Sequence, residues 1–94
     1  MSSAVAQSAV SALRISAGDD VAVALRDLGA GEALRVGGEE IVVGEAIARA
    51  HKFALRDFAA GEIVHKYGFP IGRATAAIAR GAWVHSHKIG RAHV

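Results

Sequence analysis

The chain has 94 residues, 52% hydrophobic but only 5% aromatic, with 11 basic and 9 acidic side chains and a net charge of +2. This length holds one domain whose core must be built from small aliphatic side chains, and its thin stability margin would gain from a partner surface. The balanced charge argues against a nucleic-acid-binding protein, the lack of cysteine excludes disulfides and thiolate metal sites, and no apolar run is long enough to span a bilayer.

Short strands separated by glycine turns are predicted along most of the chain. Residues 1–11 lack a hydrophobic period and the basic start of a secretory signal, so we expect a flexible tail there. The alternating and β-branched residues that follow indicate strands over 13–16, 21–25, 34–36, 41–43, 52–55, 64–67 and 74–79. Gly37-Gly38 is typical of a hairpin turn, and residues 45–50 are expected to form one helical turn. Residues 12–89 are thus predicted to form one compact, mostly β domain with at most one or two helical turns, before a short tail over 90–94.

One pattern recurs three times, in segments 28–34, 58–64 and 78–84. Each copy has an apolar residue, two small or polar residues, a glycine, two further residues and a closing apolar residue. The glycine suits a tight turn with positive φ, and the residues after it suit the start of a strand. The copies are unevenly spaced, so we interpret them as a recurring turn-to-strand device and not as a solenoid repeat.

The histidines are the first candidates for chemistry, since five occur in this short chain. His85 and His87 form a His-x-His pair, and on a strand both side chains would point to the same face and reach one metal ion. Further ligands would have to come from His51, from Asp19 and Asp20, or from a partner chain. The alternative is that both imidazoles are ordinary solvated groups.

Two other segments are candidates for binding an anionic ligand. His51 and Lys52 enter a predicted strand together and present two hydrogen-bond donors, although an ordinary surface pair would look the same. Residues 66–72 contain two glycines and a proline, which favours a shaped loop over a continued strand. In that loop the N–H groups of Gly68 and Gly72 would approach a carboxylate, unless the segment is only a structural corner.

Several segments in order resemble the SAF domain at the N-terminus of altronate dehydratases, and the corresponding domain of galactarate dehydratases looks similar. They are the heptapeptide His51-Lys52-Phe53-Ala54-Leu55-Arg56-Asp57, then Gly61-Glu62, then Lys66-Tyr67-Gly68-x-Pro70-Ile71-Gly72, then Ala79-x-Gly81-x-x-Val84-His85-x-His87, with Asp20-Val21-Ala22-Val23 at the domain opening. The resemblance covers roughly residues 13–89. The His-x-His pair favours the altronate type, because galactarate-type members lack it.

This resemblance implies a β-clip fold of short, sharply bent strands. It implies a component of a hydro-lyase of hexuronate catabolism, which converts D-altronate to 2-keto-3-deoxy-D-gluconate and water with the help of Fe²⁺ or Mn²⁺. Most catalytic residues would lie in a large partner subunit or following domain, so the catalytic residues stay unassigned and the chain alone is expected to be inactive. The residues expected to bind the sugar acid are His51, Lys52, Lys66, Tyr67, Gly68 and Gly72, and those expected to bind metal are His85 and His87.

Other functions remain open at this point. SAF domains also resemble antifreeze proteins and assembly chaperones, so a stand-alone carbohydrate-binding or interaction module is the alternative. Thr75 is the only threonine, which argues against an ice-binding face. Lys88 stands where the family usually has asparagine, and an ammonium beside a metal ligand would weaken cation binding unless it points away. We expect a cytoplasmic protein with a possible homo-oligomeric state and no membrane or nucleic-acid partner.

Overall fold

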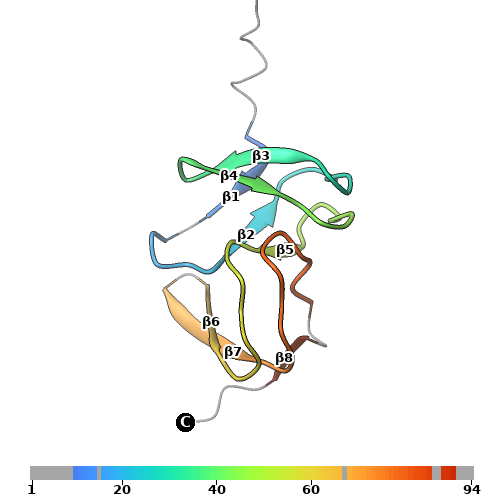
Figure 1. Cartoon of the computed structure of the whole chain (residues 1–94). Coiled ribbons are helices and arrows are strands. Elements are labelled where there is room, and N and C mark those ends of the chain that lie inside the picture. The colour runs from blue at the N-terminus through green and yellow to red at the C-terminus, as the bar shows by residue number, and fades with distance from the viewer. Residues whose placement is uncertain (1–9, 15, 67, 86–87, 91–94) are drawn as a thin grey trace, which may run out of the picture.

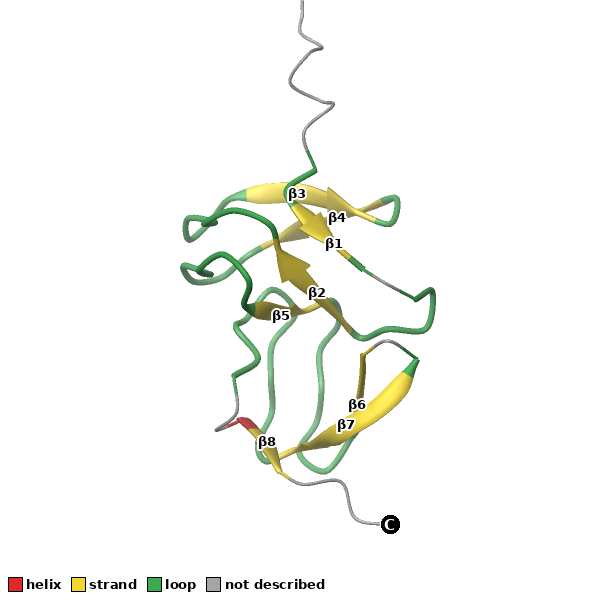
Figure 2. Ribbon diagram, turned by 180° about the vertical axis from the view of Figure 1, so that it is seen from behind, coloured by secondary structure: helices red, strands yellow, loops and turns green. Residues whose placement is uncertain are grey.

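The computed structural model describes residues 10–14, 16–66, 68–85 and 88–90 (Figure 1). These ranges contain eight short strands: β1 (Ala12–Leu13), β2 (Val21–Ala24), β3 (Ala33–Val36), β4 (Glu39–Val42), β5 (Lys52–Ala54), β6 (Ile63–Lys66), β7 (Phe69–Ala74) and β8 (Ile89–Gly90). Lys88 is the one helical residue among those described, just before β8 (Figure 2). The prediction of a mostly β protein is confirmed. No helix in the described ranges is long and apolar enough to cross a membrane.

The strands form three small antiparallel sheets, ordered β1-β2-β5, β3-β4 and β6-β7-β8. The predicted hairpin at Gly37-Gly38 is present, with Val36 paired to Glu39 and both glycines at positive φ. A two-residue turn of this kind matches the twist of the flanking strands, which is why it favours glycine. The helical turn expected over 45–50 is absent from that fully described segment, where Ile47 instead bridges to Leu28.

The chain is built from two equivalent units, which we define as residues 24–51 and 54–82. Each begins with the motif Ala-Leu-Arg-Asp followed by an apolar residue, and each continues through Gly-Glu into a hairpin. The same backbone bonds close both units: Leu28 bridges to Ile47 in the first, and Phe58 bridges to Ile78 in the second. Segment 78–84 is therefore the exit of the second unit, equivalent to the residues from Ile47 onward. It also repeats the turn of segments 28–34 and 58–64, because Gly81 has positive φ and Ala82 N donates to Ala79 O as Glu32 N donates to Gly29 O.

A one-residue insertion distinguishes the second hairpin from the first. In the β6–β7 ladder, Val64 faces Gly72 while His65 faces Pro70, so Ile71 is the extra residue of a bulge. Proline lacks the N–H that a regular ladder needs, and a bulge is one of the few places in a sheet that accept it. Residues 66–72, which we expected to form a loop, instead include the end of β6 and most of β7. The strand expected over 74–79 is also wrong, because β7 ends at Ala74 and residues 75–77 bend away.

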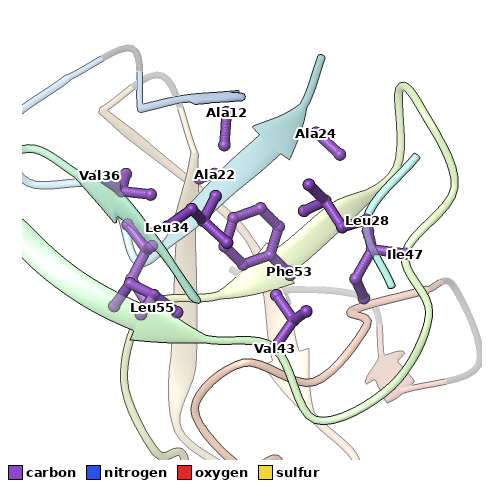
Figure 3. Packing of buried hydrophobic residues seen from close by; sticks show 11 residues of the cluster. Ala12, Ala22, Ala24, Leu28, Leu34, Val36, Val43, Ile47, Phe53 and Leu55 are labelled. Carbon is purple, nitrogen blue, oxygen red and sulfur yellow. The ribbon is translucent and has the colours of Figure 1, made fainter. Parts of the chain in front are cut away.

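The buried residues divide into two clusters separated by β2 and β5. The first cluster surrounds Phe53, whose ring is fully buried among side chains from both units and from β2 (Figure 3). The second cluster is built around Phe58, Val64 and Ile78. Burying a phenylalanine contributes about 1.5–3 kcal/mol, so Phe53 is a principal anchor of β5. Because β5 contributes Phe53 to one cluster and Ala54 to the other, it is fixed from both sides.

Candidate functional site

The candidate site lies where the exits of the two units meet. The exit of the second unit runs antiparallel to β5: Ala54 N donates to Ala82 O at 2.9 Å, and Val84 N donates to Lys52 O at 2.9 Å. Between these bonds, Trp83 bridges to Phe53. Residues far apart in the sequence are thereby placed side by side on one short ladder.

Three aromatic rings gather at this junction. The His51 imidazole stacks on the Trp83 indole, with ring centroids 4.9 Å apart and planes at 15°. The His85 ring lies 4.5 Å from the same indole, tilted by 53°. Such short offset and tilted contacts are the geometries that aromatic rings favour. Trp83 therefore joins two of the predicted histidines into one cluster.

This aromatic cluster forms the wall of a pocket of about 260 Å³. The pocket is lined by Ala50, His51, Lys52, Trp83, Val84 and His85. His51 and Trp83 also border a second hollow of about 360 Å³, beside Leu28 and Ile47. The first pocket holds the donors that an anionic polyol needs, because it combines an ammonium group with two imidazoles.

Lys52 is the cation of the pocket, and its surroundings disfavour its charge. Burial, and after it the positive charge of Lys66, lower the pKa of Lys52 below its ordinary value of 10.5. An ammonium group in this condition gains more from an incoming carboxylate than a fully solvated one does, because the ligand supplies the missing counter-charge. Lys66 is therefore close enough to act on Lys52 electrostatically, although it does not line the pocket.

The two aspartates proposed as extra metal ligands serve a structural purpose. Asp19 is buried and accepts hydrogen bonds from Ser16 N at 3.1 Å and Gly68 N at 2.8 Å. Asp20 accepts from His65 N at 2.9 Å and from Arg56 Nε at 3.1 Å. Both side chains thus fasten the start of β2 to its neighbours. Burial opposes ionisation of Asp20, but hydrogen bonds from His65 and Arg56 outweigh it and lower the pKa of this carboxyl.

The structure brings some of the predicted site residues together and separates others. His51, Lys52 and His85 share the pocket, with Lys66 nearby. The N–H of Gly68 already donates to Asp19, and Gly72 is covered by β8, so that a Cβ there would collide with Ile89 and Gly90. Tyr67 and His87 lie outside the described residues. Within those residues, no three histidine, aspartate or glutamate side chains converge as a metal site, and metal binding by His85 and His87 stays a prediction.

Sequence reasoning missed Trp83, which connects the site. A signal was present: Trp83 is the only tryptophan of the chain and stands two positions before His85, as His85 stands before His87. Its pairing with His51 was not visible, because that contact depends on the ladder between the two exits.

Comparison with known proteins agrees with this architecture. Residues 10–92 match the family model described as the altronate/galactarate dehydratase SAF domain. Over 75 residues, 80% of the chain, it is 49% identical to an altronate dehydratase of Escherichia coli and 42% identical to one of Bacillus subtilis. The chain spans only 15% of the length of either enzyme. It is also 45% identical to a (2R)-sulfolactate sulfo-lyase subunit alpha of Chromohalobacter salexigens. That alignment spans 47 residues, which is 50% of this chain and 50% of the relative. The chain therefore belongs to the family of altronate/galactarate dehydratase SAF domains.

Proposed function

We propose that this chain is the SAF component of a sugar-acid dehydratase that converts D-altronate to 2-keto-3-deoxy-D-gluconate and water. The observation that carries the proposal is the convergence of His51, Lys52 and His85 on one pocket, in a chain 49% identical to part of an altronate dehydratase. The altronate dehydratases that it matches are several times longer, so the component acts with a large catalytic subunit or region. In this proposal it contributes one wall of the active site, in the cytoplasm.

The reaction is an elimination. A base removes the C2 proton next to the carboxylate, the electron pair forms a C2–C3 double bond, and the C3–O bond breaks as the leaving hydroxyl is protonated and departs as water. The resulting enol becomes the 2-keto acid. Lys52 would hold the substrate carboxylate, and the imidazoles of His51 and His85 would donate to substrate oxygens. In the complete enzyme, Fe²⁺ or Mn²⁺ held partly by His85 and His87 would stabilise the negative charge that develops on the carboxylate.

A second substrate is favoured by one specific observation. The sulfo-lyase relative is named as a subunit, and its aligned region makes up the same fraction of its length as of this chain. Sulfolactate and altronate are both 2-hydroxy carboxylates, so a pocket that binds that group would serve either lyase. A stand-alone binding module remains the non-enzymatic candidate, and it predicts ligand binding without any catalytic partner.

The experiment combines the chain with the large catalytic subunit of the same organism and Fe²⁺, and follows 2-keto acid formation from altronate and from sulfolactate. We expect no turnover by the chain alone and turnover of altronate by the complex. His51→Ala and His85→Ala should each reduce the rate by about 100-fold, the typical contribution of a positioned proton donor. His65 is bonded to Asp20 and lies outside the pocket, so His65→Gln should leave the rate nearly unchanged. Turnover by the chain alone, or full activity of both alanine variants, would refute the proposal.

A further inference from the structure

The backbone of Trp83 is held by a pair of charged residues. Its N–H donates to Glu45 Oε2 at 3.0 Å, and its carbonyl oxygen accepts a 2.6 Å hydrogen bond from Lys88 Nζ. The two charged groups also face each other, with Lys88 Nζ 3.5 Å from Glu45 Oε2. Glu45, Lys88 and the Trp83 backbone thus form a closed ring of charge-assisted interactions, which are stronger than neutral hydrogen bonds.

The exit of the second unit also packs against the end of β4. Gly44 N donates to Gly81 O at 3.1 Å, and a Cβ at Gly81 would collide with the carbonyl oxygen of Val42. Glu45 follows directly after this contact, so it approaches Trp83 from a fixed piece of the first unit. Lys88 comes from the C-terminal part of the chain, and its own N–H donates to His85 O at 2.9 Å.

An ordinary surface ion pair would not hold the Trp83 backbone in this way. Exposed pairs contribute little, and the side chains of Lys88 and Glu45 retain 31% and 46% of their exposure. What distinguishes this pair is that both members also bond the backbone of one residue, Trp83, whose indole contacts the His51 and His85 rings. A free ammonium group at Lys88 would weaken cation binding by the histidine pair. In the structure its charge is engaged by Glu45 and the Trp83 carbonyl.

We infer that Glu45 and Lys88 are positioning residues that lock the Trp83 backbone and thereby set the orientation of the His51 and His85 rings at the pocket. The consequence for catalysis rests on the proposed function, but the consequence for ring geometry does not. Removing either charged group should loosen the indole while the two cores, which contain neither side chain, stay folded.

The test reads the ring geometry directly in the whole 94-residue chain. Trp83 is the only tryptophan, so the ring-current shift of the His51 imidazole protons in the NMR spectrum reports on the stack between these two rings. Lys88→Met and Glu45→Ala should each reduce that shift by at least about half. Glu45→Gln keeps an oxygen acceptor for the Trp83 N–H and should retain most of it. The matched control is Glu39→Ala, which breaks an exposed pair of the same 3.5 Å length, to Arg80, and should leave the shift unchanged.

The second readout is the rate of the complex with the large subunit, where Lys88→Met and Glu45→Ala should lower kcat by about 10-fold and Glu39→Ala should not. If the folded Lys88→Met and Glu45→Ala chains keep the wild-type ring-current shift, the inference is wrong whatever the activity. If the shift is lost as expected but the wild-type complex shows no dehydration, the positioning role stands and the proposed function fails. If the shift is lost and kcat stays at the wild-type value, the link from Trp83 to catalysis is refuted.

Discussion

The two units of this chain share a scaffold and differ at their exits. In each, an Arg-Asp pair starts the unit: the aspartate caps the exit through a backbone N–H, from Arg49 to Asp27 at 2.9 Å and from Arg80 to Asp57 at 2.8 Å. Each unit also carries a glutamate, Glu32 or Glu62, that bonds a turn N–H and the unit's arginine. Residues that build the scaffold have thus kept their types, as packing and turn geometry require.

The exits show where the two units differ. The backbone bonds align His51 with Ala82 and Lys52 with Trp83, since Ala24 N donates to His51 O just as Ala54 N donates to Ala82 O. The pocket therefore takes His51 and Lys52 from the first unit, and its indole, with His85 two residues further on, from the exit of the second. Two equivalent units can thus form an asymmetric site when the residues after their shared turn differ.

The largest difference between the copies should appear at the turn that precedes each exit. Ala50 and Gly81 occupy this position with φ of 75° and 87°, but only at Gly81 would a Cβ collide with another strand. Gly81→Ala should lower the free energy of unfolding by more than about 2 kcal/mol, from backbone strain and the forced movement of β4. Ala50→Gly should stay within about 1 kcal/mol of the wild type. Urea denaturation measures both, and equal effects would show that the two turns are equivalent.

Replacing the equivalent arginines, Arg26 and Arg56, should also lower the free energy of unfolding more in the second unit than in the first, although by a smaller amount. Arg26 bonds Ser11 Oγ at 3.1 Å, whereas the equivalent Arg56 bonds the Asp20 carboxylate at 3.1 Å and lies 4.0 Å above the Phe58 ring. Arg56→Ala should cost roughly 1–2 kcal/mol through the lost ion pair and cation–π contact. Arg26→Ala removes only exposed interactions and should cost less in the same denaturation assay. A larger loss at Arg26 would reverse our ranking of the two units.

Acid should act on the second unit through Asp20. Its pKa in the folded chain lies below the ordinary value of 3.8, so the charged carboxylate stabilises the fold above that value, and this contribution is lost as the pH falls through the lower folded-state pKa. Asp20→Ser, which places a neutral hydroxyl beside Arg56 as Ser11 does beside Arg26, should flatten the acid side of the stability profile. Urea midpoints measured from about pH 6 to about pH 2 test this. An unchanged slope would assign the acid sensitivity to other carboxylates.

The smallest expected effect is a stabilisation, at Lys52. Because the pKa of Lys52 is lowered in the folded chain, its charged form destabilises the fold at neutral pH, and stability rises as the pH approaches the ordinary value of 10.5. Lys52→Met should therefore stabilise the chain, by less than about 1 kcal/mol because the group is partly solvated and screened, while it reduces altronate turnover by the complex. Thermal unfolding at neutral pH measures the first effect. A destabilised Lys52→Met chain would mean that packing of the lysine stem dominates.

Much of the scaffold was readable from the sequence, because its determinants are local. Gly37-Gly38 gave the correct hairpin, and alternating residues located most strands to within one or two positions. The errors arose where long-range pairing decides: residues 66–72 read as a loop because a proline and two glycines are rare in strands, and only the partner strand β6 reveals a bulge that accommodates them. In the site, His51, Lys52 and His85 were found from their chemistry, whereas Trp83 became visible only through its ladder with Phe53.

The position of β5 as a partition between the two cores has a mechanical consequence. Phe53 is held by one cluster and Ala54 by the other, while the preceding residues, His51 and Lys52, carry the pocket donors. Close-packed interiors resist compression and transmit displacement. A load applied to either half of the molecule would therefore pass through this strand and shift the pocket wall as one piece. The donors of His51 and Lys52 are thereby presented on a rigid strand that both cores fix.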